Sequence, residues 1–171
     1  FNRIYNEVVA ATNGREVSSI PPSFEKNGFQ FPIEIKFMPK VGRGVFAKAD
    51  IPKGALLYIS TNNGAFVEGQ SFRNFLRALP RHLACDVMIW AFVRLHSMET
   101  YDDNKHMVCV DLYEGSFTNS AEMNTKEFNM ALGDDDGNLY HELKDEHEVE
   151  KLWYGCKMKF YAARDIKAGE E

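Results

Sequence analysis

The sequence contains few cysteines and no long hydrophobic run. Its three cysteines are widely spaced and odd in number, at Cys85, Cys109 and Cys156. That pattern argues against a disulfide framework, offers no paired-cysteine zinc site and favours a reducing compartment. The longest apolar stretch, 83–95, is interrupted by Asp86 and Arg94 and is shorter than the roughly 20 residues of a membrane span. We expect an intracellular protein without a membrane partner, and the sequence does not distinguish nucleus from cytoplasm.

The ends of the sequence lack the usual signals. The first residue is Phe1 rather than methionine, no charged and apolar leader follows it, and residues 168–171 carry no terminating signal. We interpret the sequence as part of a longer chain. Its 171 residues are 44% hydrophobic and 26% charged, which is typical of one globular domain. A domain of this size buries roughly 70% of its unfolded surface without needing disulfides or metals.

The negative charge is concentrated in one segment. Residues 126–151 contain nine acidic and three basic residues, a balance of −6, and the whole chain carries −5, so the remainder carries +1. Phosphates repel such a surface, so we expect no direct contact with nucleic acid. A solvated insertion explains the segment, and so does a surface that attracts a basic polypeptide.

The first third of the sequence predicts a short helix followed by strands. Ile4, Val8 and Ala11 fall on one stripe of a helix over residues 2–11. Alternating or β-branched patterns then predict strands at 31–37, 44–47 and 55–59, each preceded by a turn signal or proline.

The middle of the sequence changes to helical periodicity. Apolar residues recur every four positions over 71–98, at Leu83, Val87, Ala91 and Leu95. Pro80 divides this region into two helices. Arg73, Arg77 and Arg81 form a basic stripe that we interpret as a solvated helix face. Extended segments follow at 106–112 and 156–162, and since strands and helices do not alternate regularly, the order predicts an α+β fold of small sheets.

Three short segments partly match known binding motifs, but each departs from its motif at a required position. Residues 42–47 match the dinucleotide fingerprint G-x-G-x-x-A, but Pro52 and Gly54 exclude the helix that must follow. A glycine turn open to a ligand remains, as does a plain hairpin turn. His141 and Glu142 begin a zinc-protease motif that lacks its second histidine, and Gly137 is misplaced for a calcium loop. We expect no metal site.

Three segments, in order, resemble the SET domain of protein lysine methyltransferases. The first is VGRGVFA (41–47) with DIPKG (50–54), and the second is GSFTNSAEMN (115–124). The third is FYAARDIKAGEE (160–171), which closely matches the closing motif of the family. The resemblance implies a SET-like domain over 31–171 after an N-terminal extension over 1–30. It also implies a helical insertion at about 70–105, besides the acidic insertion at about 126–151, and a pseudoknot-like crossing near the asparagine segment.

The resemblance implies methyl transfer from S-adenosyl-L-methionine to a lysine side chain of a protein substrate. The sulfonium is already an activated donor, so the protein has to align the reacting atoms and receive lysine as a neutral amine. Lysine has an ordinary pKa of about 10.4, and an apolar channel beside a positive sulfonium favours its neutral form. A basic, lysine-rich segment is the expected substrate, attracted by the acidic insertion.

The resemblance also implies roles for individual residues. It assigns the methionine end of the cofactor to Gly42, Arg43, Gly44 and Asn119. It assigns the lysine channel to Phe117 and Tyr161, because aromatic walls exclude water and tolerate a methylammonium product. Tyr161 is equally explained as an ordinary core aromatic.

The sequence departs from the family after Asn119. Ser120 stands where the family has histidine, and Ala121 and Met123 stand where it has cysteine and proline. The main catalytic tyrosine of the family is expected beyond Glu171, so we expect this segment alone to be inactive. These departures leave an alternative, a catalytically inactive SET-like module that binds proteins.

Overall fold

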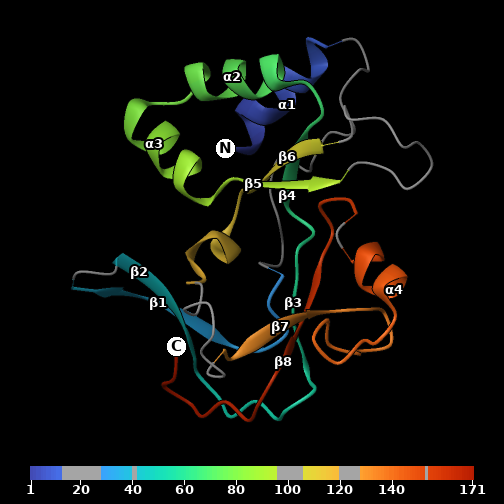
Figure 1. Ribbon diagram of the computed structural model, residues 1–171. Coiled ribbons are helices and arrows are strands. Elements are labelled where there is room, and N and C mark those ends of the chain that lie inside the picture. The colour runs from blue at the N-terminus through green and yellow to red at the C-terminus, as the bar shows by residue number, and fades with distance from the viewer. Residues whose placement is uncertain (13–27, 40–41, 96–105, 120–127, 153) are drawn as a thin grey trace. The chain divides into compact units, whose positions relative to one another are not determined.

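The computed structural model describes residues 1–12, 28–39, 42–95, 106–119, 128–152 and 154–171 (Figure 1). Its helices are α1 (Asn2–Ala10), α2 (Gly69–Ala78), α3 (Arg81–Trp90), α4 (Glu146–Lys151) and the 3-10 helix η1 (Glu114–Phe117). Its strands are β1 (Ile33–Met38), β2 (Gly42–Ala47), β3 (Leu56–Ile59), β4 (Asn63–Phe66), β5 (Phe92–Leu95), β6 (His106–Asp111), β7 (Met130–Gly133) and β8 (Lys159–Ala162).

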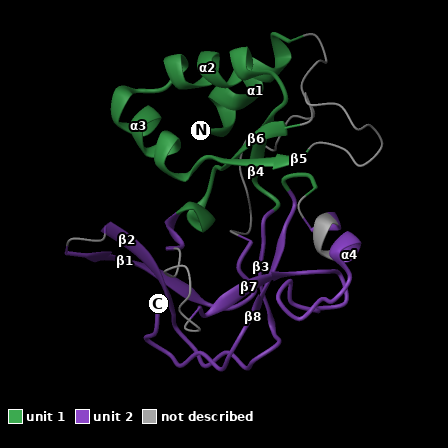
Figure 2. Cartoon of the chain, viewed as in Figure 1, with its two compact units in different colours: residues 1–25, 61–116, 153–156 green, residues 26–60, 117–152, 157–171 purple. Residues whose placement is uncertain are grey.

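The chain folds into two compact units, each assembled from separated segments (Figure 2). Unit 1 comprises residues 1–25, 61–116 and 153–156, and unit 2 comprises 26–60, 117–152 and 157–171. Unit 1 holds the sheet β4-β6-β5, and unit 2 holds the hairpin β1-β2 and the sheet β3-β8-β7. All of these pairings are antiparallel. The predicted α+β class with small sheets is confirmed.

An aromatic cluster forms the core of unit 1. Tyr5 of α1 is fully buried, and its ring packs edge-on against Phe66 and Phe75 with centroids 5.1 and 6.3 Å away. The Tyr5 hydroxyl donates to the carbonyl of Ala65 and accepts from its amide, both at 3.0 Å, so the buried polar group is satisfied. The predicted helix is confirmed, but its inward stripe was placed wrongly: Tyr5 and Val9 are buried and Ala11 is exposed.

Pro80 divides the helical region as predicted, with α2 before it and α3 after it. The expected helical stripe through Ala91 and Leu95 was wrong. Ala91 already has an extended backbone, and Phe92–Leu95 pairs with β6 in register with His106–Cys109. Phe, Val and Leu fit a half-buried strand as well as a helix, and the pairing with β6 decides between them.

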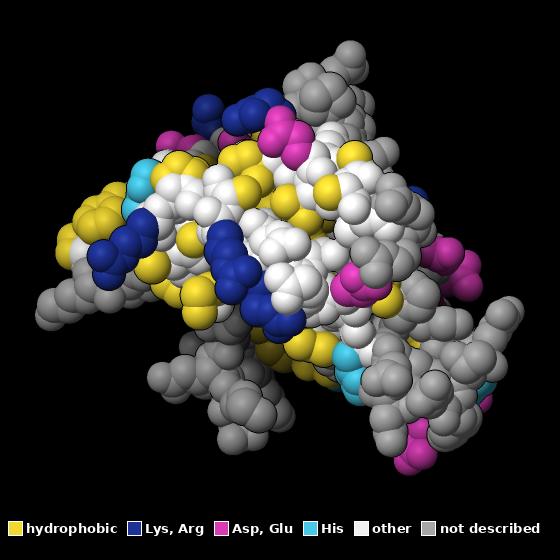
Figure 3. Space-filling view, turned by 90° about the horizontal axis from the view of Figure 1, so that it is seen from above, with side chains coloured by type: hydrophobic (Ala, Val, Ile, Leu, Met, Phe, Trp, Pro, Cys, Tyr) yellow, Lys and Arg dark blue, Asp and Glu magenta, His cyan; other side chains and the backbone are white. Residues whose placement is uncertain are grey.

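The three arginines at four-residue spacing, Arg73, Arg77 and Arg81, are exposed on α2 and α3. Figure 3, which views the molecule from above, shows Lys and Arg side chains spread among hydrophobic and neutral ones on this face. Arg73 donates to the side chain of Gln70 in the preceding turn, at 2.9 Å. These positions agree with a solvated helix face. Within the described residues, none of the helices is long and apolar enough to cross a membrane.

The cysteine pattern argued against a disulfide framework, and the structure contains one disulfide. Cys109 of β6 and Cys156 form a disulfide with their Cα atoms 5.9 Å apart, and Cys85 is free and exposed. The paired cysteines are 47 positions apart in sequence, so spacing gave no sign of their pairing. Both are buried in a small cluster with Ala65 and Met107. The bond fastens residues 154–156 to β6 within unit 1.

Unit 2 buries its own apolar cluster around Ile51, Leu57, Ala162 and Ile166. The predicted strands appear here as β1, β2, β3 and β8, within two residues of their expected limits at most ends. The acidic segment contributes β7 and α4, and β7 was not predicted because Met130–Gly133 is short and ends in glycine.

Replacing Cys156 with serine should lower the free energy of unfolding by about 2–4 kcal/mol, because the disulfide closes a long loop in the unfolded chain. Denaturant titration with and without a thiol reductant measures this, and the reductant should destabilise the wild type by a similar amount. Cys85→Ser is the matched control and should change stability by less than about 0.5 kcal/mol. A wild-type midpoint that does not respond to reductant would contradict the assignment.

Candidate functional site

The opening motif forms β2, and its two glycines, Gly42 and Gly44, lie at positions that favour glycine. Gly42 has φ of +108°, in the region that favours glycine, at the point where β2 begins. Gly44 is buried, and a Cβ at this position would lie 2.8 Å from Cε of Met38 and would also meet the Glu171 carboxylate. The absent side chain therefore leaves room beside the β2 backbone for the Glu171 carboxylate.

The closing motif lies directly against the segment that follows β2. Ile51 and Ile166 exchange both backbone hydrogen bonds, at 2.8 and 2.9 Å, and both side chains are buried. The Gly54 amide also donates to the carbonyl of Ala162 at 2.8 Å. Residues more than a hundred positions apart thus form one structural element.

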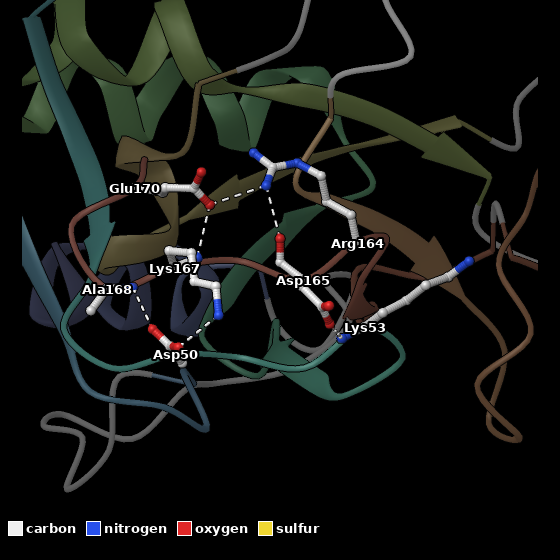
Figure 4. Close-up of polar contacts among 7 residues, drawn as sticks. All are labelled: Asp50, Lys53, Arg164, Asp165, Lys167, Ala168 and Glu170. Atoms are coloured by element: carbon white, nitrogen blue, oxygen red, sulfur yellow. Dashed lines mark hydrogen bonds and ion pairs between the residues drawn. The ribbon is translucent and has the colours of Figure 1, made fainter.

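Charged side chains reinforce this pairing (Figure 4). One oxygen of Asp50 accepts from the Lys167 ammonium at 2.9 Å, and the other accepts from the Ala168 amide at 3.0 Å. These contacts lower the pKa of Asp50 and raise that of Lys167. The Asp165 carboxylate accepts from the Lys53 amide at 2.8 Å. Asp50 of the opening motif therefore binds residues of the closing motif, and Asp165 of the closing motif binds a residue of the opening motif.

Glu170 closes the turn at the end of the motif. Its carboxylate accepts from the Lys167 amide at 2.8 Å and from the Arg164 guanidinium at 3.0 Å (Figure 4). Both contacts hold the pKa of Glu170 below its ordinary value, the backbone bond having the larger effect. Gly169 has φ of +92°, as a turn position favouring glycine requires.

The same turn places Glu171 beside the opening motif. Ala47 at the end of β2 donates to the carbonyl of Glu170 at 2.9 Å and accepts from the Gly169 amide at 2.8 Å. The side chain of Glu171 then lies against Gly44 and accepts a hydrogen bond from Nδ2 of Asn119.

Four of the sequence-predicted site residues are brought together here. Asn119 Nδ2 donates to the carbonyl of Arg43 at 3.4 Å, so the asparagine segment reaches β2. The Arg43 guanidinium lies over the Phe117 ring, with Cζ 4.3 Å from the centroid, which is a cation–π contact. Gly44 follows directly. The remaining asparagine motif, 120–124, lies outside the described residues.

Tyr161 occupies a different position. It is buried in β8 with Ala131 and Leu139, and its hydroxyl donates to the carbonyl of Asp134 at 2.9 Å. Burial raises the pKa of this hydroxyl above its ordinary value. A Cβ on Gly133 would lie 2.7 Å from its ring. This placement agrees with the core-aromatic interpretation, and the assignment to a lysine channel stays a prediction.

The acidic loop after β7 organises itself through its own backbone. Asp134 Oδ1 accepts from the amides of Asp136 and Asn138 at 2.9 and 2.8 Å, and Oδ2 accepts from the Asn138 side chain at 2.8 Å. The described residues contain no group of three or more His, Cys, Asp or Glu side chains placed to hold a metal ion.

The residues present fit the methionine end of S-adenosylmethionine. Beside the β2 backbone at Gly44, Oδ1 of Asn119 and the Glu171 carboxylate supply hydrogen-bond acceptors, which suit the ammonium group of that end. Sequence reasoning identified Gly42, Arg43, Gly44 and Asn119 but gave Glu171 no part in the site. The only feature of the sequence that pointed to Glu171 was its place at the end of the closing motif.

Comparisons with known proteins identify the family and the fold. A model of the SET domain family matches residues 42–171. The fold is similar to the Neurospora SET domain protein DIM-5, a histone lysine methyltransferase, with 16% identity, a TM-score of 0.50, and coverage of 84% of this chain and 51% of that one. The chain thus spans about half the length of that protein chain.

A second similar structure is a Plasmodium falciparum protein assigned as a histone methyltransferase. It is 17% identical with a TM-score of 0.42, and the match covers 83% of this chain and 90% of that one. No curated protein matches the sequence.

Acid should destabilise the protein partly through Asp50. A carboxyl whose folded pKa is lowered stabilises the fold above its ordinary pKa, and this contribution is lost as the pH falls through the folded value. Asp50→Asn should therefore be less stable than the wild type at pH 7, and the difference should shrink below about pH 4. Urea midpoints measured from pH 7 to pH 3 test this. Glu142→Gln, an exposed control, should follow the wild type; a constant difference between Asp50→Asn and the wild type would contradict the prediction.

Proposed function

Because the chain belongs to the SET domain family, we propose that it takes part in S-adenosylmethionine-dependent transfer of a methyl group to a lysine side chain of a protein. The observation that carries the proposal is the meeting of three separated motifs in unit 2. Ile51 pairs with Ile166, and Asn119 contacts both Arg43 and Glu171. Such a meeting is needed if these motifs are to form one binding site.

The proposed cofactor site uses mainly backbone groups. The strand around Gly42, Arg43 and Gly44 would hold the methionine end, and the Asn119 side chain would contact it from the facing segment. When bound, S-adenosylmethionine supplies a methyl group already activated by its sulfonium. The contribution of the protein is then orientation, since correct alignment alone can account for several kcal/mol of the barrier.

The proposed lysine-binding side relies on Phe117 and, as the weaker assignment, on Tyr161. An aromatic wall removes water from the lysine amine and thereby favours its neutral form. The Phe117 ring already contacts a cation, because the Arg43 guanidinium lies over it. The ring can therefore stabilise a cation, and a methylammonium product would take the place of the guanidinium on this face.

The proposed substrate is a basic, lysine-rich protein segment. Asp135, Asp136, Asp145 and Glu146 of the acidic segment are exposed. Their carboxylates would raise the local concentration of a basic partner and speed its association, most strongly at low salt. This part of the proposal concerns the encounter rather than the methyl transfer.

We also propose an intracellular location, which the small number of cysteines supports. The Cys109–Cys156 disulfide weighs against it, because such bonds are rare in reducing compartments. Alkylation of the protein in freshly lysed cells, followed by mass spectrometry, tests the location. An intracellular protein kept reduced would be alkylated at both Cys109 and Cys156.

Calorimetric titration with S-adenosylmethionine tests the cofactor assignment. We expect binding by the wild type and a loss of at least about tenfold in affinity for Asn119→Ala, since hydrogen bonds to charged groups contribute about 1.5–3 kcal/mol. Asn74→Ala on α2 is the matched control and should bind like the wild type. Absence of binding at millimolar ligand would refute the proposal. Binding without transfer of labelled methyl to any lysine peptide would favour the inactive protein-binding module.

A further inference from the structure

We propose that Glu171 is a positioning residue, whose carboxylate fixes the orientation of the Asn119 side-chain amide and leaves its carbonyl oxygen for a ligand. The identity of that ligand as S-adenosylmethionine rests on the function proposed above, whereas the positioning itself rests on contacts within unit 2. Neither the sequence motifs nor the family comparison assigned a role to Glu171.

The backbone leaves Glu171 little freedom to be elsewhere. Its neighbour Glu170 accepts from the Ala47 amide at 2.9 Å, and Gly169 donates to the Ala47 carbonyl at 2.8 Å. The Glu170 side chain is itself held by Arg164 and by the Lys167 amide. A short segment fastened on both sides of its turn therefore delivers the next side chain to β2.

Gly44 makes the position of this carboxylate possible. An added Cβ at Gly44 would collide with Oε1 of Glu171, so the carboxylate occupies space that only a glycine leaves open. From there it reaches Asn119, which belongs to the middle segment of unit 2. Three residues from three separate segments thus meet at one point.

The hydrogen-bonding capacity of Asn119 explains the effect. An asparagine amide has two donors on Nδ2 and an acceptor on Oδ1. Both donors are engaged, one by the Arg43 carbonyl at 3.4 Å and one by the Glu171 carboxylate. Rotating the amide by half a turn would place Oδ1 against the negative carboxylate. That orientation is repulsive, so Glu171 excludes it.

The outcome is a defined preference for one kind of ligand group. With Nδ2 engaged, the Asn119 side chain offers a ligand its acceptor oxygen and no donor. Such a site favours an ammonium group over a carboxylate. For an amino-acid-like ligand end, Glu171 would therefore determine which of its two charged groups faces Asn119.

The decisive experiment compares two ligands by calorimetry with the same protein variants. S-adenosylmethionine carries the amino-acid end, and 5′-deoxy-5′-methylthioadenosine lacks it. Glu171→Ala should weaken binding of the first by about tenfold and leave the second within about twofold. Glu171→Gln keeps an acceptor oxygen toward Asn119 and should lose no more than about threefold. Glu142→Gln removes the same charge from an exposed position and should bind both ligands like the wild type.

A double-mutant cycle separates positioning from a merely structural effect. If Glu171 acts through Asn119, the double variant Asn119→Ala with Glu171→Ala should bind S-adenosylmethionine no more weakly than Asn119→Ala alone. Equal weakening of both ligands by Glu171→Ala, or additive losses in the double variant, would overturn the proposal.

A ligand-free measurement keeps this test distinct from that of the proposed function. The side-chain amide resonances of Asn119 should shift in a nitrogen–proton correlation spectrum of Glu171→Ala and stay in place in Glu142→Gln. Unchanged resonances in Glu171→Ala would overturn the positioning role even if the cofactor binds. If they shift but the wild type fails to bind S-adenosylmethionine, the positioning role stands and the proposed function falls.

Discussion

The paired backbone bonds between Ile51 and Ile166 are the constraint on which the rest of unit 2 depends. They bring the closing motif to the segment after β2, and burial of both isoleucines removes water from around them. Asp50, Asp165 and Glu170 are exposed or partly exposed, so the ion pairs of Asp50 and Glu170 add modest stability and serve, like the hydrogen bond of Asp165, mainly to fix geometry. The position of Glu171 beside Gly44 follows from this arrangement.

Strongly patterned segments were predictable from sequence, because their information is local. The alternation in β1, the proline between α2 and α3, and the ordered motifs around Gly44 and Asp165 each indicated the structure that formed. The motifs also gave the SET domain family correctly, which composition and periodicity alone did not. Four of the predicted site residues, Arg43, Gly44, Phe117 and Asn119, contact one another or common partners.

The remaining features depend on partners distant in sequence. Phe92–Leu95 became a strand because β6 lies beside it, and Cys109 found Cys156 across a long separation. The inward face of α1 differs from the predicted stripe because it includes Tyr5. The large ring of Tyr5 can be buried, since its hydroxyl finds hydrogen-bond partners. Glu171 was not predicted because its place in the closing motif gives no indication that its carboxylate contacts the Asn119 amide.

The position of β8 has a consequence for biosynthesis. It is the central strand of its sheet, with β3 on one side and β7 on the other, yet it follows both of them in the sequence. A ribosome makes both outer strands before the strand that joins them. Until then β3 and β7 have unpaired edges, which invite pairing with other chains. Unit 2 can therefore close only once translation has passed β8, and chaperone protection of the nascent chain would matter most in that interval.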